Sequence, residues 1–305
     1  MRNTLAMLVT ATAVASGLAL SAPVSAAPIQ AAATPLQAAA KPPRNNGLNE
    51  PIYWVHGWQK GDKPSANCAT AWNPAINRYR ALGARGAQHT VAYYKNDKSC
   101  NTRIGNFNNS TSIRELGRKL AWDIYNRYSR RNVSVDAVGH SMGGLIIRTA
   151  ITGTQSRWSG FPPRLYVEDV TTISTPHTGS TLAAICRSGS CAQMKKGSAF
   201  LKTLTKNPQS AQGTDWTLIG SGDDDTVNWQ SAVSSNSRAA GYIAAGHRVV
   251  YISKQGLEHG TIYKKTAGAY KLRYWNFYQN RWINQARGAA PVVVARNANF
   301  YWRNW

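Results

Sequence analysis

The stretch VSVDAVGHSMGGLIIRTAIT, residues 133–152, decides the fold because its pattern changes at a single residue. VSVDAVGH is a short apolar run, typical of a buried strand, and MGGLIIRTAIT is typical of a helix that follows at once. Ser141 lies at the junction, with Gly139 two positions before it and Gly143 two positions after it. A tight strand-to-helix turn needs small residues at both places, since strand and helix approach closely there. The stretch therefore predicts a strand–turn–helix unit with Ser141 at its tip.

Five further apolar runs are predicted strands, and segments with helical spacing separate several of them. The strands are expected at residues 51–58, 89–95, 167–175, 216–223 and 247–253, and the helices at residues 73–82 and 112–128. Strands that alternate with helices imply parallel crossover connections. We therefore expect an α/β protein with a mostly parallel, doubly wound sheet of about six strands and helices on both faces.

The start of the chain has the three-part pattern of a secretory signal peptide. It combines Arg2, an apolar stretch over residues 5–20 and small residues at 24–26. A membrane anchor is the alternative, but the apolar run is short and rich in alanine. We expect a signal peptide at 1–26, a flexible lead-in at 27–46, a catalytic domain at 47–285 and an extension at 286–305 packed on that domain. The mature protein is expected to be secreted and extracellular.

The last 45 residues contain two segments whose secondary structure can be predicted. Tyr270, Tyr274, Tyr278 and Trp282 are four residues apart, which favours a terminal helix over residues 261–282 that packs on the sheet. A substrate-binding aromatic face is the alternative. Residues 287–305 are interpreted as an added edge strand.

Four cysteines are expected to form two disulfides, because an exported chain meets an oxidising environment. Cys186 and Cys191 lie in the short CRSGSC loop and pair most easily with each other, which leaves Cys68 with Cys100. The other two connectivities stay open. A zinc site is the rival interpretation, but no CxxC pair supports it.

The chain is strongly basic: 36 Lys and Arg residues against 13 Asp and Glu residues give a formal charge of +23. Such a charge attracts anionic lipid surfaces or anionic polymers, so peripheral contact with them is a candidate property. An ordinary solvated surface is the alternative. No specific nucleic-acid contact and no metal or organic cofactor is expected, and a monomer is favoured.

A reactive serine needs a base, and the base needs a carboxylate that orients it. After a turn of this kind the acid and then the histidine follow in the chain, each in a loop beyond a later strand. The loops GSGDDDTVN at 220–228 and QGLEHGTIY at 255–263 fit that order. They supply three consecutive aspartates and His259. The first loop lacks the wider DxDxDG spacing of a calcium site.

The remaining histidines are weaker candidates for the base. His177 precedes the acids in the chain, and His247 precedes its strand and so belongs to the opposite edge of the sheet. His140 is next to Ser141 and is expected to face away from it, and His89 begins a strand. His259 is therefore the preferred base.

Attack on an ester carbonyl places negative charge on oxygen, which two fixed N–H donors must receive. The residue after the nucleophile, Met142, supplies one donor in such turns. The other is expected from the loop after the first strand, where HGW places Trp58.

These motifs resemble those of secreted bacterial lipases of the α/β-hydrolase superfamily, most closely class 2 (Bacillus-type) and actinobacterial triacylglycerol lipases. The resemblance covers VHGW, VDAVGHSMGG, STPHTG, LIGSGDDDTVN and GLEHG, between Pro51 and Gly260. It implies Ser141 as nucleophile and His259 as base. Family members carry the acid three residues before a valine, which selects Asp224 and leaves Asp225 as the fallback. The resemblance also supports Trp58, although family members usually carry a different apolar residue there.

The expected function is that of a secreted serine carboxyl-ester hydrolase of the lipase or esterase type. It would cleave lipid-like esters through an acyl-enzyme on Ser141. Hydrolysis or acyl transfer on another acyl substrate, such as a phospholipid or a polyester, is the alternative within the enzyme class. A noncatalytic protein that binds an anionic polymer on the same fold is the rival from another class.

Overall fold

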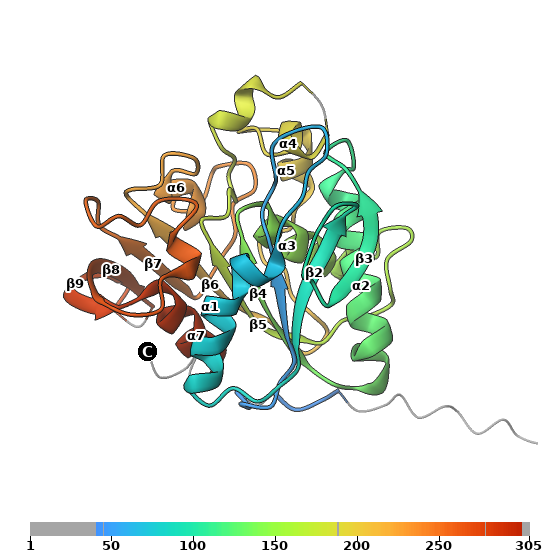
Figure 1. Ribbon diagram of the computed structural model, residues 1–305, viewed down its shortest axis with the longest axis horizontal. Coiled ribbons are helices and arrows are strands. Elements are labelled where there is room, and N and C mark those ends of the chain that lie inside the picture. Colours follow the sequence, from blue (N-terminus) through green and yellow to red (C-terminus); the bar gives the residue numbers. More distant parts are fainter. Residues whose placement is uncertain (1–40, 45, 188, 278, 301–305) are drawn as a thin grey trace, which may run out of the picture. The chain divides into compact units, whose positions relative to one another are not determined.

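The computed structural model describes residues 41–44, 46–187, 189–277 and 279–300 (Figure 1). These residues belong to one compact unit. The expected signal peptide at 1–26 and most of the expected lead-in lie outside the described residues, as do the last five residues. Over the described ranges, no helix has both the length and the apolar character that crossing a membrane requires.

Within these ranges nine strands form one sheet in the order β3-β2-β1-β4-β5-β6-β7-β8-β9. The strands from β3 to β7 in this order are parallel, and β8 and β9 join antiparallel at one edge. The expected α/β class with a mostly parallel sheet is confirmed, and the sheet is wider than the six strands expected. The strand bounds are β1 Ile52–Val55, β2 Gln88–Tyr94, β3 Thr102–Phe107, β4 Val135–His140, β5 Val167–Ile173, β6 Asp215–Ser221, β7 His247–Tyr251, β8 Ala269–Asn276 and β9 Arg281–Ala289.

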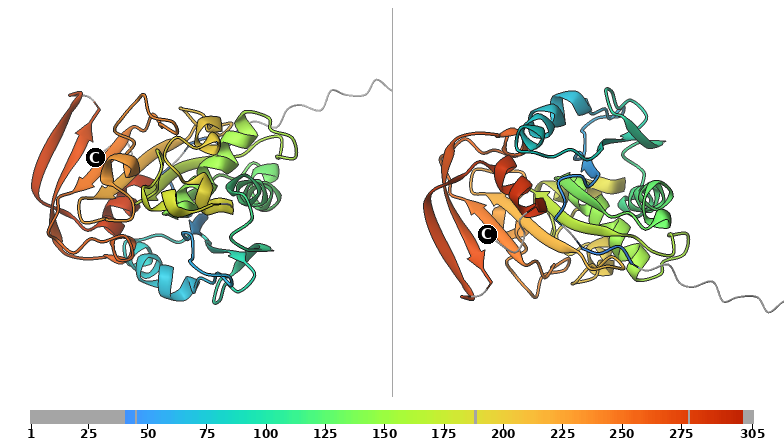
Figure 2. Two further views of the ribbon diagram at one scale, coloured as in Figure 1. Left: turned by 90° about the horizontal axis from the view of Figure 1, so that it is seen from above. Right: turned by 90° about the horizontal axis from the view of Figure 1, so that it is seen from below.

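Helices cover both faces of the sheet, as Figure 2 shows. α2 and α3 pack on one face, and α1 and α7 pack on the other. β1 illustrates the division: Tyr53 and Val55 point to the first cluster, and Ile52 and Trp54 to the second. The helix bounds are α1 Cys68–Ala81, α2 Ile113–Arg127, α3 Met142–Gln155, α4 Gly189–Gln193, α5 Ala199–Thr203, α6 Trp229–Ala232 and α7 Pro291–Phe300, with 3-10 turns at Ser129–Arg131, Leu182–Ile185 and Ile262–Lys264.

The strand order reverses direction between β1 and β4. From β1 the chain first adds β2 and β3 on one side, then crosses to β4 and continues outward on the other side. In open α/β sheets, ligands bind beyond the carboxyl ends of the strands at such a switch point. The loops after β1 and β4 therefore border the place where a site is expected.

The expected terminal helix over residues 261–282 is wrong. This segment holds a 3-10 turn and the strand β8, and β9 begins at Arg281 and pairs with β8. The error has a physical cause, because a spacing of four residues also keeps side chains on one face of a strand. Tyr270, Leu272 and Tyr274 all pack toward the cluster shared with α1 and α7.

The expected edge strand in residues 287–305 is also wrong over most of its described part. β9 ends at Ala289, and α7 then begins at Pro291. Proline is favoured at the first helical position, and burial of Val292 and Ala295 outweighs the strand preference of the valine run. The boundary expected at residue 286 falls inside β9.

Both favoured disulfides are confirmed. One joins Cys68 to Cys100 and the other joins Cys186 to Cys191. The first ties the start of α1 to the loop between β2 and β3, where the backbone N–H of Cys68 also donates to the carbonyl oxygen of Lys98. It therefore fixes the first turn of α1 against the sheet.

Candidate active site

Ser141 occupies the turn between β4 and α3 in a strained conformation. Its φ angle is 54°, in the left-handed region that favours glycine. Its backbone N–H donates to the carbonyl oxygen of Ile173 on β5, 3.0 Å away. A Cβ atom at Gly139 would lie 2.6 Å from the backbone of Gly144, and one at Gly143 would overlap the carbonyl group of Val55. Glycine at both positions therefore allows α3 to begin directly beside the sheet.

His259 connects Ser141 to Asp224. Its Nε2 lies 3.0 Å from the hydroxyl oxygen of Ser141, and its Nδ1 lies 2.9 Å from Oδ2 of Asp224. The Asp224 carboxylate is fully buried, whereas His259 is 18% exposed. The backbone N–H groups of Thr226 and Val227 also donate to Asp224, which fixes the carboxylate for the histidine.

The three consecutive aspartates have different surroundings. Asp224 alone contacts His259. Asp223 accepts hydrogen bonds from the backbone of Gln255 and Leu257, just before His259. Burial alone would raise the pKa of Asp223, but these N–H groups lower it below its usual value. Asp225 is bonded only to the hydroxyl of Thr226 among the described residues.

The other histidines do not reach Ser141. His177 is buried and bonds to the Thr172 hydroxyl, 2.9 Å away, and burial and Arg148 hold its pKa well below the usual value. Burial lowers the pKa of His247 to about 4. His89 bonds to the hydroxyls of Thr102 and Tyr128.

His140 lies beside the histidine of the site. Its ring stacks on Tyr263, with ring centroids 4.0 Å apart, and lies 4.8 Å from the ring of His259. Burial and the neighbouring His259 hold the pKa of His140 well below its usual value. The ring is therefore neutral and has one N–H group to donate.

The loop after β1 lies next to the turn that holds Ser141, because Val55 pairs with Gly139 in the sheet. Trp58 lines the same pocket as Ser141. Met142 is fully buried and opens α3, so its backbone N–H has no acceptor inside the helix. Both residues expected to donate to an oxyanion are thus brought to the edge of the site.

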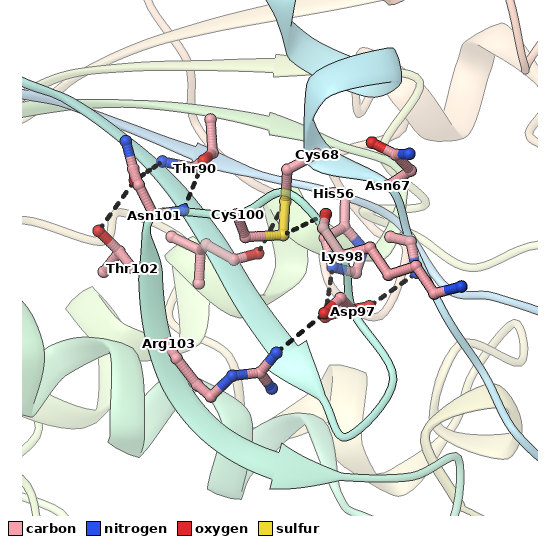
Figure 3. The surroundings of a disulfide bond; sticks show 12 residues. His56, Asn67, Cys68, Thr90, Asp97, Lys98, Cys100, Asn101, Thr102 and Arg103 are labelled. Carbon is pink, nitrogen blue, oxygen red and sulfur yellow. Dashed lines mark hydrogen bonds and ion pairs between the residues drawn. A yellow bond between two sulfur atoms is a disulfide. The ribbon is translucent and has the colours of Figure 1, made fainter.

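A buried His56–Asp97 pair anchors this loop, and sequence reasoning missed it. The Nε2 of His56 lies 3.0 Å from the Asp97 carboxylate (Figure 3). The Nδ1 of His56 lies 2.9 Å from the carbonyl oxygen of Gly57. Both partners are hydrogen-bond acceptors, so each ring nitrogen of His56 faces an oxygen atom. Burial would raise the pKa of Asp97, but the bond and charge of His56 lower it below its usual value.

Tyr93 adds a second anchor to the loop. Its hydroxyl donates toward the carbonyl oxygens of His56 and Gly57, 2.9 and 2.8 Å away, and its ring stacks on His56. One sequence signal was present, because Asp97 is one of only 13 acidic residues and lies in a loop after a strand.

A pocket of about 380 Å³ opens at Ser141 and His259. Its walls come from the loop after β1, the first turn of α1 and the segment after His259, and they include Trp58, Tyr263 and Lys264. A larger pocket of about 480 Å³ is lined by Asp224 and Asp225 but not by Ser141. No group of three or more His, Cys, Asp or Glu residues in the described ranges could hold a metal ion.

Residues 91–214 match the family described as "Putative serine esterase (DUF676)". This segment contains Ser141 and ends before Asp224 and His259. No curated protein matches the chain.

Several solved structures are similar to the chain. A lipase of Bacillus licheniformis in its mature form shares 16% identity, with 74% of this chain and 91% of that chain covered and a TM-score of 0.45. Lipase B of Aspergillus fumigatus shares 18% identity, covering 67% of this chain and 45% of that chain at a TM-score of 0.43. A phospholipase of Legionella pneumophila shares 13% identity, with 57% of this chain and 39% of that chain covered and a TM-score of 0.37.

Proposed function

We propose that the protein is a serine carboxyl-ester hydrolase of the lipase or esterase type, with lipid-like or other carboxylic esters as substrates. The observation that carries the proposal is the position of the His259 ring, 3.0 Å from the Ser141 hydroxyl and 2.9 Å from the Asp224 carboxylate. The family match over residues 91–214 supports it.

The first half of the reaction forms an acyl-enzyme. Nε2 of His259 takes the proton from Ser141, whose Oγ attacks the ester carbonyl carbon, and Asp224 stabilises the charged imidazole. The backbone N–H groups of Met142 and Trp58 donate to the oxyanion. His259 then returns the proton to the departing alcohol as the carbon–oxygen bond breaks.

The second half releases the acid. Water loses a proton to His259 and attacks the acyl-enzyme, and Ser141 leaves with that proton restored. The fixed conformation of Ser141 and the short bonds of His259 mean that little reorganisation precedes either half.

The protein is further proposed to be secreted as a monomer after cleavage behind Ala26. The three-part pattern at 1–26 and the two disulfides support export. The charge of +23 supports peripheral contact with anionic lipid surfaces or polymers. Intact mass of the protein recovered from the medium should correspond to a chain that begins at Ala27.

The catalytic proposal is tested by hydrolysis of p-nitrophenyl butyrate. Ser141→Ala should lower kcat by about 10⁴-fold or more, because the nucleophile is lost. Ser156→Ala is the matched control, since Ser156 is exposed at the other end of α3 and should keep full activity. A Ser141→Ala protein with wild-type kcat would contradict the proposal.

A further inference from the structure

The described walls of the Ser141 pocket contain no aliphatic hydrophobic side chain larger than alanine. Among the described residues that line it, none is Val, Leu, Ile, Met or Phe, and the large apolar groups are the rings of Trp58 and Tyr263. The other walls are polar side chains, glycine and alanine, such as Gln59, Asn67 and Thr70. Small-molecule pockets are ordinarily lined by mostly hydrophobic side chains, so this pocket departs from the common pattern.

This composition limits the acyl group that can be bound. Each methylene group removed from water into an apolar pocket improves binding by about fourfold. That gain requires apolar walls along the whole acyl chain, and the described lining supplies two large apolar rings, those of Trp58 and Tyr263. An acyl chain beyond a few carbons therefore stays in contact with water or polar groups and gains little.

The charge of the same walls has one sign. Lys264 lines the pocket, with its Nζ 5.2 Å from the ring centroid of Tyr263, and no described carboxylate lies within 4.0 Å of it. No Asp or Glu is among the described lining residues. Lys264 is the one Lys or Arg among the described residues that line the pocket, so it is the cation that a substrate meets. Lys264 therefore favours negative charge near the ester.

We infer that the site selects esters with a short acyl group and an anionic group close to the ester bond. The inference rests on the proposed function, since it assigns a substrate class to the same Ser141 pocket. It places the acyl group between the rings of Trp58 and Tyr263 and the anionic group beside Lys264.

The acyl part is tested with p-nitrophenyl acetate, butyrate, octanoate and decanoate at concentrations where all are soluble. The expected result is that kcat/KM is highest for acetate or butyrate and at least tenfold lower for decanoate. A kcat/KM that rises through octanoate and decanoate would overturn the inference while leaving the proposed function intact. No turnover of any ester would overturn both.

The charge part is tested with 4-acetoxybenzoate and its neutral methyl ester, which share the acyl group. To correct for intrinsic reactivity, the kcat/KM of each ester is divided by the rate constant of its alkaline hydrolysis. The corrected value for the anionic ester is then divided by that for the neutral ester, and this ratio is compared between the wild type and each variant. Lys264→Gln should lower this ratio about fivefold at low ionic strength, the factor that one charge pair in water supplies at about 4 Å. Salt should lower the wild-type ratio in the same direction.

Lys265→Gln is the matched control, because it removes the same charge one residue away and Lys265 does not line the pocket. It should keep the wild-type ratio. An unchanged ratio in Lys264→Gln, or an equal fall in both variants, would overturn the anionic preference.

Discussion

His140 donates a hydrogen bond from Nε2 to the backbone carbonyl oxygen of His259, 2.9 Å away. The donor comes from the end of β4 and the acceptor from the loop after β7, so the bond links the turn that holds Ser141 to the loop that holds its histidine. Because burial keeps His140 neutral, its single N–H is committed to this bond. His140 is therefore a positioning residue.

Replacement of His140 should lower kcat while Ser141, Asp224 and His259 are all retained. His140→Phe keeps an aromatic ring against Tyr263 but loses the N–H donor, and we expect kcat on p-nitrophenyl butyrate to fall about ten- to hundredfold through misplacement of His259. His140→Gln retains an N–H donor and should recover part of the loss. Full kcat in His140→Phe would show that the bond does not position His259.

We propose Asp224, and not its neighbour Asp225, as the acid because, of the two, only Asp224 contacts His259. Asp224→Asn should lower kcat by about 10⁴-fold, because the histidine loses its carboxylate while the side-chain shape is kept. Asp225→Asn is the matched control and should change kcat by less than about threefold, since Asp225 has no bond to His259. The reverse order of effects would assign the acid to Asp225.

A buried carboxyl group at the opposite end of the sheet should make stability depend on pH. Burial raises the pKa of Glu50 to about 10, and the nearby carboxyl groups of Asp136 and Glu168 add to this effect. Because the pKa of Glu50 is higher in the folded state than its unfolded value of 4.5, the protonated carboxyl group favours folding. This contribution to stability is complete below pH 4.5 and is lost as the pH rises through the folded-state pKa. The wild-type protein should therefore lose stability steadily between pH 5 and pH 9.

Glu50→Gln tests this dependence because it cannot ionise. Relative to wild type, the variant should gain at least about 1 kcal/mol of unfolding free energy between pH 5 and pH 8, measured by urea denaturation. Glu258→Gln, at an exposed position, is the control and should follow the wild-type profile. Parallel profiles for wild type and Glu50→Gln would show that Glu50 ionises freely.

The two disulfides should contribute unequally to stability. The Cys68–Cys100 bond closes a separation of 32 residues and the Cys186–Cys191 bond closes one of 5 residues. Loop entropy then gives about 3.7 kcal/mol for the first and about 2 kcal/mol for the second. The double alanine variants, compared by denaturant unfolding, should follow that order; an equal or reversed order would contradict the entropic account.

Much of the fold around the site could be predicted because the signal is local. The valine-rich strand, Ser141 and the helix after it form one continuous pattern, and each glycine has a steric purpose. The order of the later loops also pointed to His259 and to the three consecutive aspartates, among which the family resemblance selected Asp224. Parallel strands bring these loops to one edge, where His259 lies beside Asp224.

The remaining elements depend on contacts that a single pass along the chain does not reveal. β3 lies in a polar, asparagine-rich segment and is held by pairing with β2. The four-residue spacing of Tyr270 and Tyr274 fits a helix or a strand, and pairing with β7 decides for the strand. The His56–Asp97 pair joins residues 41 positions apart, without a motif that links them.

The central claim, that Ser141 is a nucleophile activated by His259, is tested most directly by labelling with a fluorophosphonate probe. Intact mass and peptide mapping should show one adduct per chain, on Ser141, with ester hydrolysis lost in proportion to labelling. Ser141→Ala should take up no probe, and His259→Ala should react far more slowly. An unlabelled wild-type protein, or one that still hydrolyses esters after complete labelling of Ser141, would contradict the account.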